Sequence, residues 1–181
     1  MDWTIGNIPS LATLKPELVL TFYPQSFPLR WGLCSTTADF CADYLATREP
    51  FSASRDAINY VLNELVENAV KFSEGEAITI TLALDGDTLV LLVTNHVGES
   101  TAEKLYNKLC KLLAGDPLEL LMRRVEENAE NPDNEGSGLG FLTMMTDYEA
   151  SLGWRLTGPA EVEGQPLLST VACLKVAAAP R

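Results

Sequence analysis

The longest regular pattern of apolar and polar positions lies in the middle of the chain. Between residues 54 and 72, apolar side chains recur every three or four positions, which predicts a helix with one face against a core. Ser54 is placed to cap this helix. Two apolar runs follow at 77–84 and 88–95, and the turn at residues 85–87 makes them a predicted β-hairpin.

The pattern before residue 54 is shorter and less regular. Leu18–Phe22 and Pro28–Leu33 are short apolar runs, and we expect them to form a hairpin or a pair of edge strands. Ser35 or Thr36 is expected to cap a helix that continues to about Thr47.

The second half of the chain is predicted to hold three helices and two strands, at 101–113, 117–129 and 141–147, and at 149–156 and 167–176. Asp116 is the expected cap of the second of these helices, and a glycine-rich loop at 136–140 precedes the third. Helices grouped with antiparallel strands predict an α+β domain rather than a regular alternation of parallel strands and helices.

Composition narrows the function classes. The chain has 181 residues, of which 46% are apolar, so we expect effectively one domain: an N-terminal element at 1–34 that adds strands or a dimer face, and a main domain at 35–181. A net charge of −12 argues against nucleic-acid binding and against an electrostatic membrane anchor. With no apolar run of membrane length, no signal-peptide pattern and four scattered cysteines, we expect a cytoplasmic protein with reduced thiols.

One candidate site lies on the polar face of the central helix. At 100° per residue, Glu64, Asn68 and Lys71 fall within about 60° of one another. An amide oxygen one turn from a carboxylate suits Mg²⁺ binding, while the carboxylate orients a water or a hydroxyl group. The alternative is an ordinary solvated face, in which Glu67 and Lys71 form an i,i+4 pair.

The second candidate site is the glycine-rich loop. Gly136, Gly138 and Gly140 let the backbone approach a phosphate, and the helix that follows points its amides toward that charge. The loop matches neither the dinucleotide-binding pattern nor a P-loop. The alternative here is a hinge after a charged segment.

Taken together, the two sites resemble a known family. The run Asn63–Ser73 resembles the N box of the GHKL superfamily of ATPases, which includes gyrase, histidine kinases and MutL, and Gly136–Phe141 resembles its second glycine box. The resemblance covers about residues 35–176. It implies an α+β two-layer sandwich of the Bergerat ATP-binding type, with a mixed, mostly antiparallel sheet packed on helices and a helical ATP lid at about 98–135.

The resemblance also implies roles for individual residues. Asn68 would bind Mg²⁺, Glu64 would activate the attacking group as the catalytic residue, and Lys71 would contact phosphate. The triphosphate loop would consist of Gly136, Gly138, Leu139 and Gly140. Asn95 stands where the superfamily usually has the Asp that receives the adenine amino group; an Asn carbonyl accepts the same hydrogen bond without a charge.

Among small stand-alone members, the chain resembles the anti-sigma-factor serine/threonine kinases of bacterial partner switching, and most nearly the SiaB type, whose lid carries spaced leucines. This resemblance implies an ATP- and Mg²⁺-dependent kinase that phosphorylates Ser or Thr of a STAS-domain partner, and it leaves a homodimer open. A histidine autokinase does not fit, because His96 is the one histidine. Two alternatives remain: a catalytically degenerate domain that binds a regulator, and an ATPase switch without a protein substrate.

Overall fold

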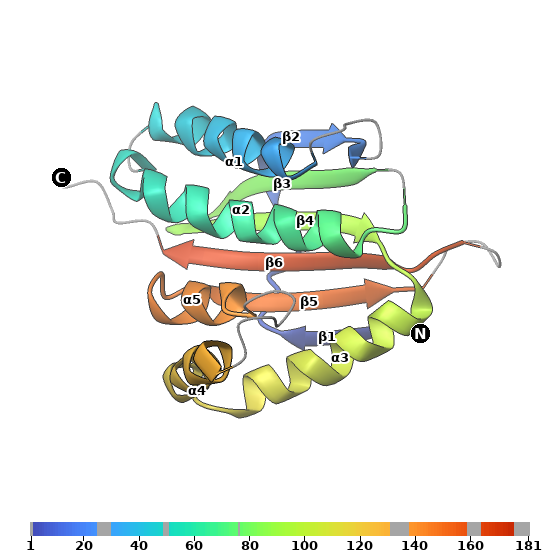
Figure 1. The fold of residues 1–181 in the computed structure, drawn as a ribbon. Coiled ribbons are helices and arrows are strands. Elements are labelled where there is room, and N and C mark those ends of the chain that lie inside the picture. Colours follow the sequence, from blue (N-terminus) through green and yellow to red (C-terminus); the bar gives the residue numbers. More distant parts are fainter. Residues whose placement is uncertain are drawn as a thin grey trace.

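The computed structural model describes residues 2–24, 30–48, 51–75, 77–130, 138–158 and 164–175. Its strands form one six-stranded sheet in the order β1-β5-β6-β4-β3-β2, and all five pairings are antiparallel (Figure 1). The strands are β1 (Trp3–Gly6), β2 (Lys15–Phe22), β3 (Ile78–Asp85), β4 (Thr88–His96), β5 (Ser151–Thr157) and β6 (Leu167–Lys175). The helices are α1 (Arg30–Ala46), α2 (Arg55–Phe72), α3 (Glu99–Ala114), α4 (Pro117–Glu130) and α5 (Gly140–Thr146).

The main core lies between the sheet and the helices α1, α2 and α5, which cover one face of it (Figure 1). The apolar stripe of α2, including Ile58, Leu62 and Leu65, is buried in this core. Alternate residues of β3, such as Ile78 and Ile80, reach the same core because successive strand side chains point to opposite faces. The predicted α+β two-layer sandwich and the hairpin of β3 and β4 are confirmed.

The N-terminal residues belong to the same sheet. β1 pairs with β5 and β2 pairs with β3, so they form the two edges of the sheet. The segment between them crosses the face opposite the helices, where Ile8, Leu11 and Leu14 pack against Val90 and Val171. The segment therefore covers apolar surface that the two-layer arrangement would otherwise expose.

The predicted strand at Pro28–Leu33 is wrong within the described residues, because residues 30–33 lie in α1; Pro28 and Leu29 fall outside those residues. The helix begins before Ser35 because its buried stripe, which includes Cys34 and Cys41, continues along it against α2. Neither Ser35 nor Thr36 caps the helix, because both lie inside it and their hydroxyls donate to the Gly32 carbonyl. Ser54 does precede α2, but its side chain makes no capping hydrogen bond.

Two helices, α3 and α4, form a lid beside the sandwich, next to α5 and β1 (Figure 1). The Asp116 carboxylate accepts hydrogen bonds from the amides of Leu118 and Glu119, both at 3.0 Å, which confirms the predicted cap. Leu109 of α3 is buried, whereas no residue of α4 is. In the part of the chain described here, no helix is long and apolar enough to cross a membrane.

Candidate functional site

The polar face of α2 lines a cleft made of two adjoining cavities. One, here called the Glu64 cavity, has a volume of about 230 Å³ and is lined by Glu64, Lys71, Gly138 and Gly140 among others. The other, the Asn95 cavity, has a volume of about 380 Å³. The cavities form one cleft because the same four residues line both: Asn68, Phe72, Lys108 and Phe141.

Asn68 is fixed at the junction of the two cavities. Its Nδ2 donates to the Glu64 backbone carbonyl one turn earlier, at 2.7 Å. This bond uses the amide nitrogen, so the amide oxygen is the atom that remains to meet a cation in the cleft.

The Glu64 carboxylate lies against the first residue of α5. A Cβ on Gly140 would come within 2.0 Å of Glu64 Oε2, so only glycine fits there without moving the carboxylate. Burial raises the pKa of the Glu64 carboxyl, and the nearby charge of Glu67 raises it further. Glu67 is itself held by Asn63, whose Nδ2 donates to Oε1 at 2.9 Å. The arrangement makes Glu64 a stronger proton acceptor than an exposed glutamate.

The Asn95 cavity combines an apolar lining with two buried polar groups. Asn95 is only 2% exposed, and its Nδ2 donates to the His96 carbonyl at 3.3 Å, which leaves its amide oxygen for a ligand N–H. Trp154 is fully buried, and its indole Nε1 has no acceptor among the described residues. The indole N–H lies inside the core, out of reach of a ligand, so Trp154 contributes apolar ring surface to the cavity.

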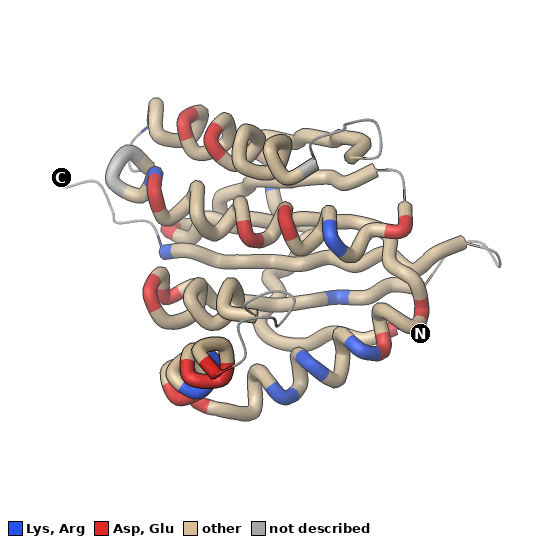
Figure 2. The backbone as a smooth tube through the Cα atoms, in the orientation of Figure 1, with Lys and Arg blue, Asp and Glu red and all other residues tan. Residues whose placement is uncertain are grey.

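Cations from the lid complete the cleft. Lys104 lines the Asn95 cavity, and Lys108, one turn further along α3, lines both cavities. Burial lowers the pKa of the Lys108 ammonium, and the nearby charges of Arg124 and Lys71 lower it further. Figure 2 shows the Lys positions along α3 in blue, and Asp, Glu and Lys positions together along α2.

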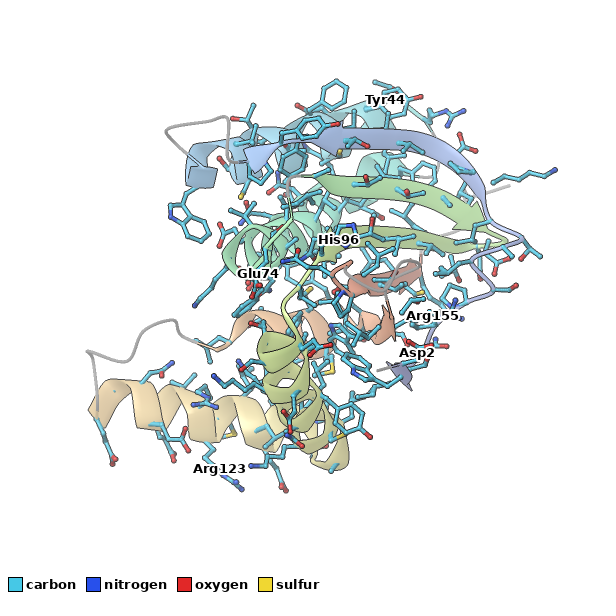
Figure 3. All side chains as sticks on the ribbon, turned by 90° about the vertical axis from the view of Figure 1, so that its right-hand side faces the viewer. Asp2, Tyr44, Glu74, His96, Arg123 and Arg155 are labelled. Carbon is cyan, nitrogen blue, oxygen red and sulfur yellow. The ribbon has the colours of Figure 1, made fainter. Side chains whose placement is uncertain are left out.

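The base of the lid is built around Glu74 and His96, which lie close together where α2, β4 and α3 meet (Figure 3). The Glu74 amide donates to the His96 carbonyl at 3.0 Å. The Glu74 carboxylate accepts long hydrogen bonds from Thr101 of α3, at 3.4 Å, and from Gln165, at 3.5 Å. These contacts tie the first turn of the lid to the end of α2.

The structure brings together six of the eight predicted site residues. Five of them line the Glu64 cavity: Glu64, Asn68, Lys71, Gly138 and Gly140. Asn95 lines the adjoining cavity. Leu139 lies between the two glycines, and its carbonyl accepts a hydrogen bond from the Thr143 amide at 2.8 Å. Gly136 lies outside the described residues. The roles assigned to all eight stay predictions.

Sequence reasoning missed Lys108, Trp154 and the cleft role of Trp31, which lines the Glu64 cavity with 57% of its surface exposed. A signal for Lys108 existed, because Lys104, Lys108 and Lys111 recur at i, i+4 and i+7 and so share one helix face. The sequence alone does not show that this helix face lines the cleft, because that depends on where α3 lies relative to α2.

Replacing Gly140 by Ala is expected to move the Glu64 carboxylate without unfolding the protein. The added Cβ collides with the end of a side chain that can turn away, and Ala favours a helix by about 1 kcal/mol over Gly. We expect the free energy of unfolding to change by less than about 1 kcal/mol, and the Glu64 pKa, measured by NMR titration, to fall toward its ordinary value. Gly86→Asn, in a distant turn, is the control; a Glu64 pKa that does not move in Gly140→Ala contradicts this geometry.

One comparison with known proteins gives a match. A family model described as histidine kinase-, DNA gyrase B-, and HSP90-like ATPase matches residues 53–173, about two thirds of the chain. The matched region runs from the residue before Ser54 through α2, the hairpin, the lid and α5 into β6, and it includes the described lining residues of both cavities except Trp31. A search of curated proteins finds no match.

Proposed function

The chain belongs to the histidine kinase-, DNA gyrase B- and HSP90-like ATPase family, and on that basis we propose that it is a regulatory serine/threonine kinase of the anti-sigma-factor type. Membership of the family implies that the chain binds ATP, typically with Mg²⁺. The observation that carries the finer proposal is the Glu64 cavity. There a carboxylate of raised pKa, a fixed amide and one Lys from α2 line the same cavity as Lys108 of α3.

The described residues fit Mg-ATP. In the Asn95 cavity, the Asn95 oxygen suits the exocyclic amino group of adenine, and the apolar lining residues suit its ring. Lys71 and Lys108 line the adjoining cavity, where their charges would neutralise a triphosphate, and the Asn68 amide oxygen is the proposed ligand for Mg²⁺. The bound ion would offset the phosphate charge as it develops during transfer.

Glu64 is the proposed proton acceptor. It takes the proton from the attacking hydroxyl of a Ser or Thr side chain, whose oxygen forms a bond to the γ-phosphorus. The bond from that phosphorus to the β,γ-bridging oxygen breaks, and its electron pair leaves with ADP. Lys108 and Lys71 stay on the phosphate side and compensate the charge that spreads over the transferring group.

Transfer to a partner, rather than to the chain's own histidine, is supported by the surroundings of His96. Its Nδ1 lies 3.1 Å from the Gln165 carbonyl, and its side chain packs against Gly75 at the base of the lid. His96 is exposed, but it is the last residue of strand β4, whereas a histidine autokinase carries its phosphoacceptor on a dimerising helical hairpin. The proposed partner is a STAS-domain protein, and this part of the proposal comes from the sequence resemblance.

The test is a transfer assay. The chain is incubated with Mg-ATP labelled at the γ-phosphate and with a purified STAS-domain protein from the same organism. Label on a Ser or Thr of that protein supports the kinase. Label released only as inorganic phosphate supports an ATPase switch, and ATP binding without either product supports a binding module; both overturn the kinase proposal.

Replacing Asn95 by Leu is expected to lower the affinity for ATP by at least about tenfold and to reduce the preference for ATP over GTP. Leu is similar in size, but it offers no acceptor to the adenine amino group, and such polar recognition discriminates strongly. Calorimetric titration of ATP and GTP checks this. Asn95→Asp is the matched control and keeps the affinity, because its carboxylate accepts the same bond; equal ATP affinity in Asn95→Leu contradicts the assignment.

A further inference from the structure

A third cavity lies outside the cleft, between the two lid helices and the first described residue of the glycine loop. Its volume is about 270 Å³. It adjoins the Glu64 cavity, with which it shares Lys108 and Gly138. Four cations line it: Lys108, Lys111, Arg123 and Arg124. Three leucines and one carboxylate complete its described lining: Leu112, Leu120, Leu142 and Glu127. We call it the α3–α4 cavity.

The α3–α4 cavity is lined mainly by positive charges, although the chain as a whole has a net charge of −12. Six of the 13 Lys and Arg residues line this cavity or the cleft: Lys71, Lys104, Lys108, Lys111, Arg123 and Arg124. Within the described ranges, the one ion pair in the lid joins Arg124 to Glu127 at 3.1 Å, and both side chains are substantially exposed. Such a pair contributes little to stability, so the fold does not account for gathering these cations.

The same cations repel one another. The nearby charge of Arg124 helps to lower the pKa of Lys108, and burial of Lys108 is the larger cause. Like charges brought together in a partly buried cavity destabilise the lid unless an anion joins them. Two guanidinium groups, from Arg123 and Arg124, have the planar, two-pronged geometry that matches phosphate oxygens.

We propose that the α3–α4 cavity binds a small phosphate-bearing anion as a second site, separate from the nucleotide in the cleft. The phosphate groups contact Lys111, Arg123 and Arg124, while the leucines receive an apolar portion of the ligand. The assignment does not depend on the proposed kinase activity, since Lys111 and Arg123 line neither cavity of the cleft.

Occupation of this site would join α3 to α4. No residue of α4 is fully buried, and the helix packs against α5 more than against α3. An anion bound jointly by Lys111 of α3 and Arg123 of α4 supplies a bridge between them. The bound state is therefore a more ordered lid next to the glycine loop, and the anion acts as a regulator of lid position.

The test uses inorganic pyrophosphate as the probe. Pyrophosphate is titrated by calorimetry at low salt into the whole chain, with and without a saturating non-hydrolysable Mg-ATP analogue. Hydrogen exchange is measured in parallel. We expect binding in both conditions and slower exchange within α3 and α4. The double variant Lys111→Gln/Arg123→Gln is expected to bind pyrophosphate at least tenfold more weakly and to lose the exchange protection.

The matched control is Lys15→Gln/Arg155→Gln, which removes the same two charges from β2 and β5 and is expected to bind like the wild type; circular dichroism establishes that each variant is folded. Absence of pyrophosphate binding to the wild type, or an unchanged affinity in the first double variant, overturns the second site. Loss of pyrophosphate binding only when the Mg-ATP analogue is present also overturns the second site, because the cavity then holds the nucleotide's own phosphates. If the analogue fails to bind at all, the kinase proposal fails, and the pyrophosphate comparison still decides this one.

Discussion

Replacing Asn68 by Ala is expected to lower the affinity for Mg-ATP by about 100-fold, as measured by calorimetry. Asn68 lines both cavities of the cleft, and its amide nitrogen donates to the Glu64 carbonyl, so we expect its amide oxygen to be the atom that meets Mg²⁺. Loss of a group that orients or binds a metal typically costs a factor of 10 to about 100 in affinity. The magnesium-free nucleotide in EDTA should lose much less, since its base still reaches Asn95.

Asn59→Ala is the control for the Asn68 experiment. Asn59 lies on the same helix, but its Nδ2 donates to Asp39 of α1 at 2.7 Å, away from the cleft. We expect its affinity for Mg-ATP to match the wild type. If Asn68→Ala binds Mg-ATP normally, Asn68 is not the magnesium ligand. If it weakens ATP equally with and without Mg²⁺, its role is to shape the cleft.

The parts of the fold that the sequence predicts are those with a strong local pattern. The apolar residues of α2 recur at a spacing that only a helix brings onto one face. The same helix places Glu64, Asn68 and Lys71 together on the opposite face. The hairpin follows from two apolar runs around a tight turn, where Gly86 adopts a positive φ of 64°. In both cases residues close in the sequence decide the structure.

The parts that failed or went unnoticed depend on contacts between distant residues. β1 pairs with β5, about 150 positions later in the chain. A strand of four residues is too short for its pattern of apolar and polar positions to indicate which strand it pairs with. Trp31 and Leu33 suggest a strand in isolation, but burial of the Cys34 stripe against α2 extends α1 through them. Likewise, Lys108 lines the cleft only because the fold brings α3 to the side of the cleft opposite α2.

Replacing Glu64 by Gln is expected to lower phosphoryl transfer, or the hydrolysis of ATP, by a factor of about 10² to 10⁴, and to leave Mg-ATP affinity within a few-fold of the wild type. Gln keeps the size of the side chain next to Gly140 but cannot accept the hydroxyl proton. Turnover of γ-labelled ATP and calorimetry measure the two effects separately. An equal rate in Glu64→Gln shows that Glu64 is not the proton acceptor.

The raised pKa of Glu64 adds a pH dependence to this prediction. The carboxylate acts as a base only when deprotonated, so the rate should rise with pH through that raised pKa. Glu67→Gln removes the nearby charge that contributes to the shift, so it should move this rise to lower pH, and Glu64→Gln should abolish it.

Stability should change in the opposite sense to activity. A raised carboxyl pKa means that the folded protein holds the Glu64 proton more tightly than the unfolded chain does. This contribution to stability is present below the ordinary pKa of Glu and is lost as the pH rises through the folded value. We therefore expect Glu64→Gln to be at least as stable as the wild type at neutral pH, with a smaller advantage in acid, by denaturant unfolding. A variant that loses turnover while gaining stability has lost a catalytic group and not a structural one. Destabilisation at neutral pH would show instead that the charged carboxylate supports the fold.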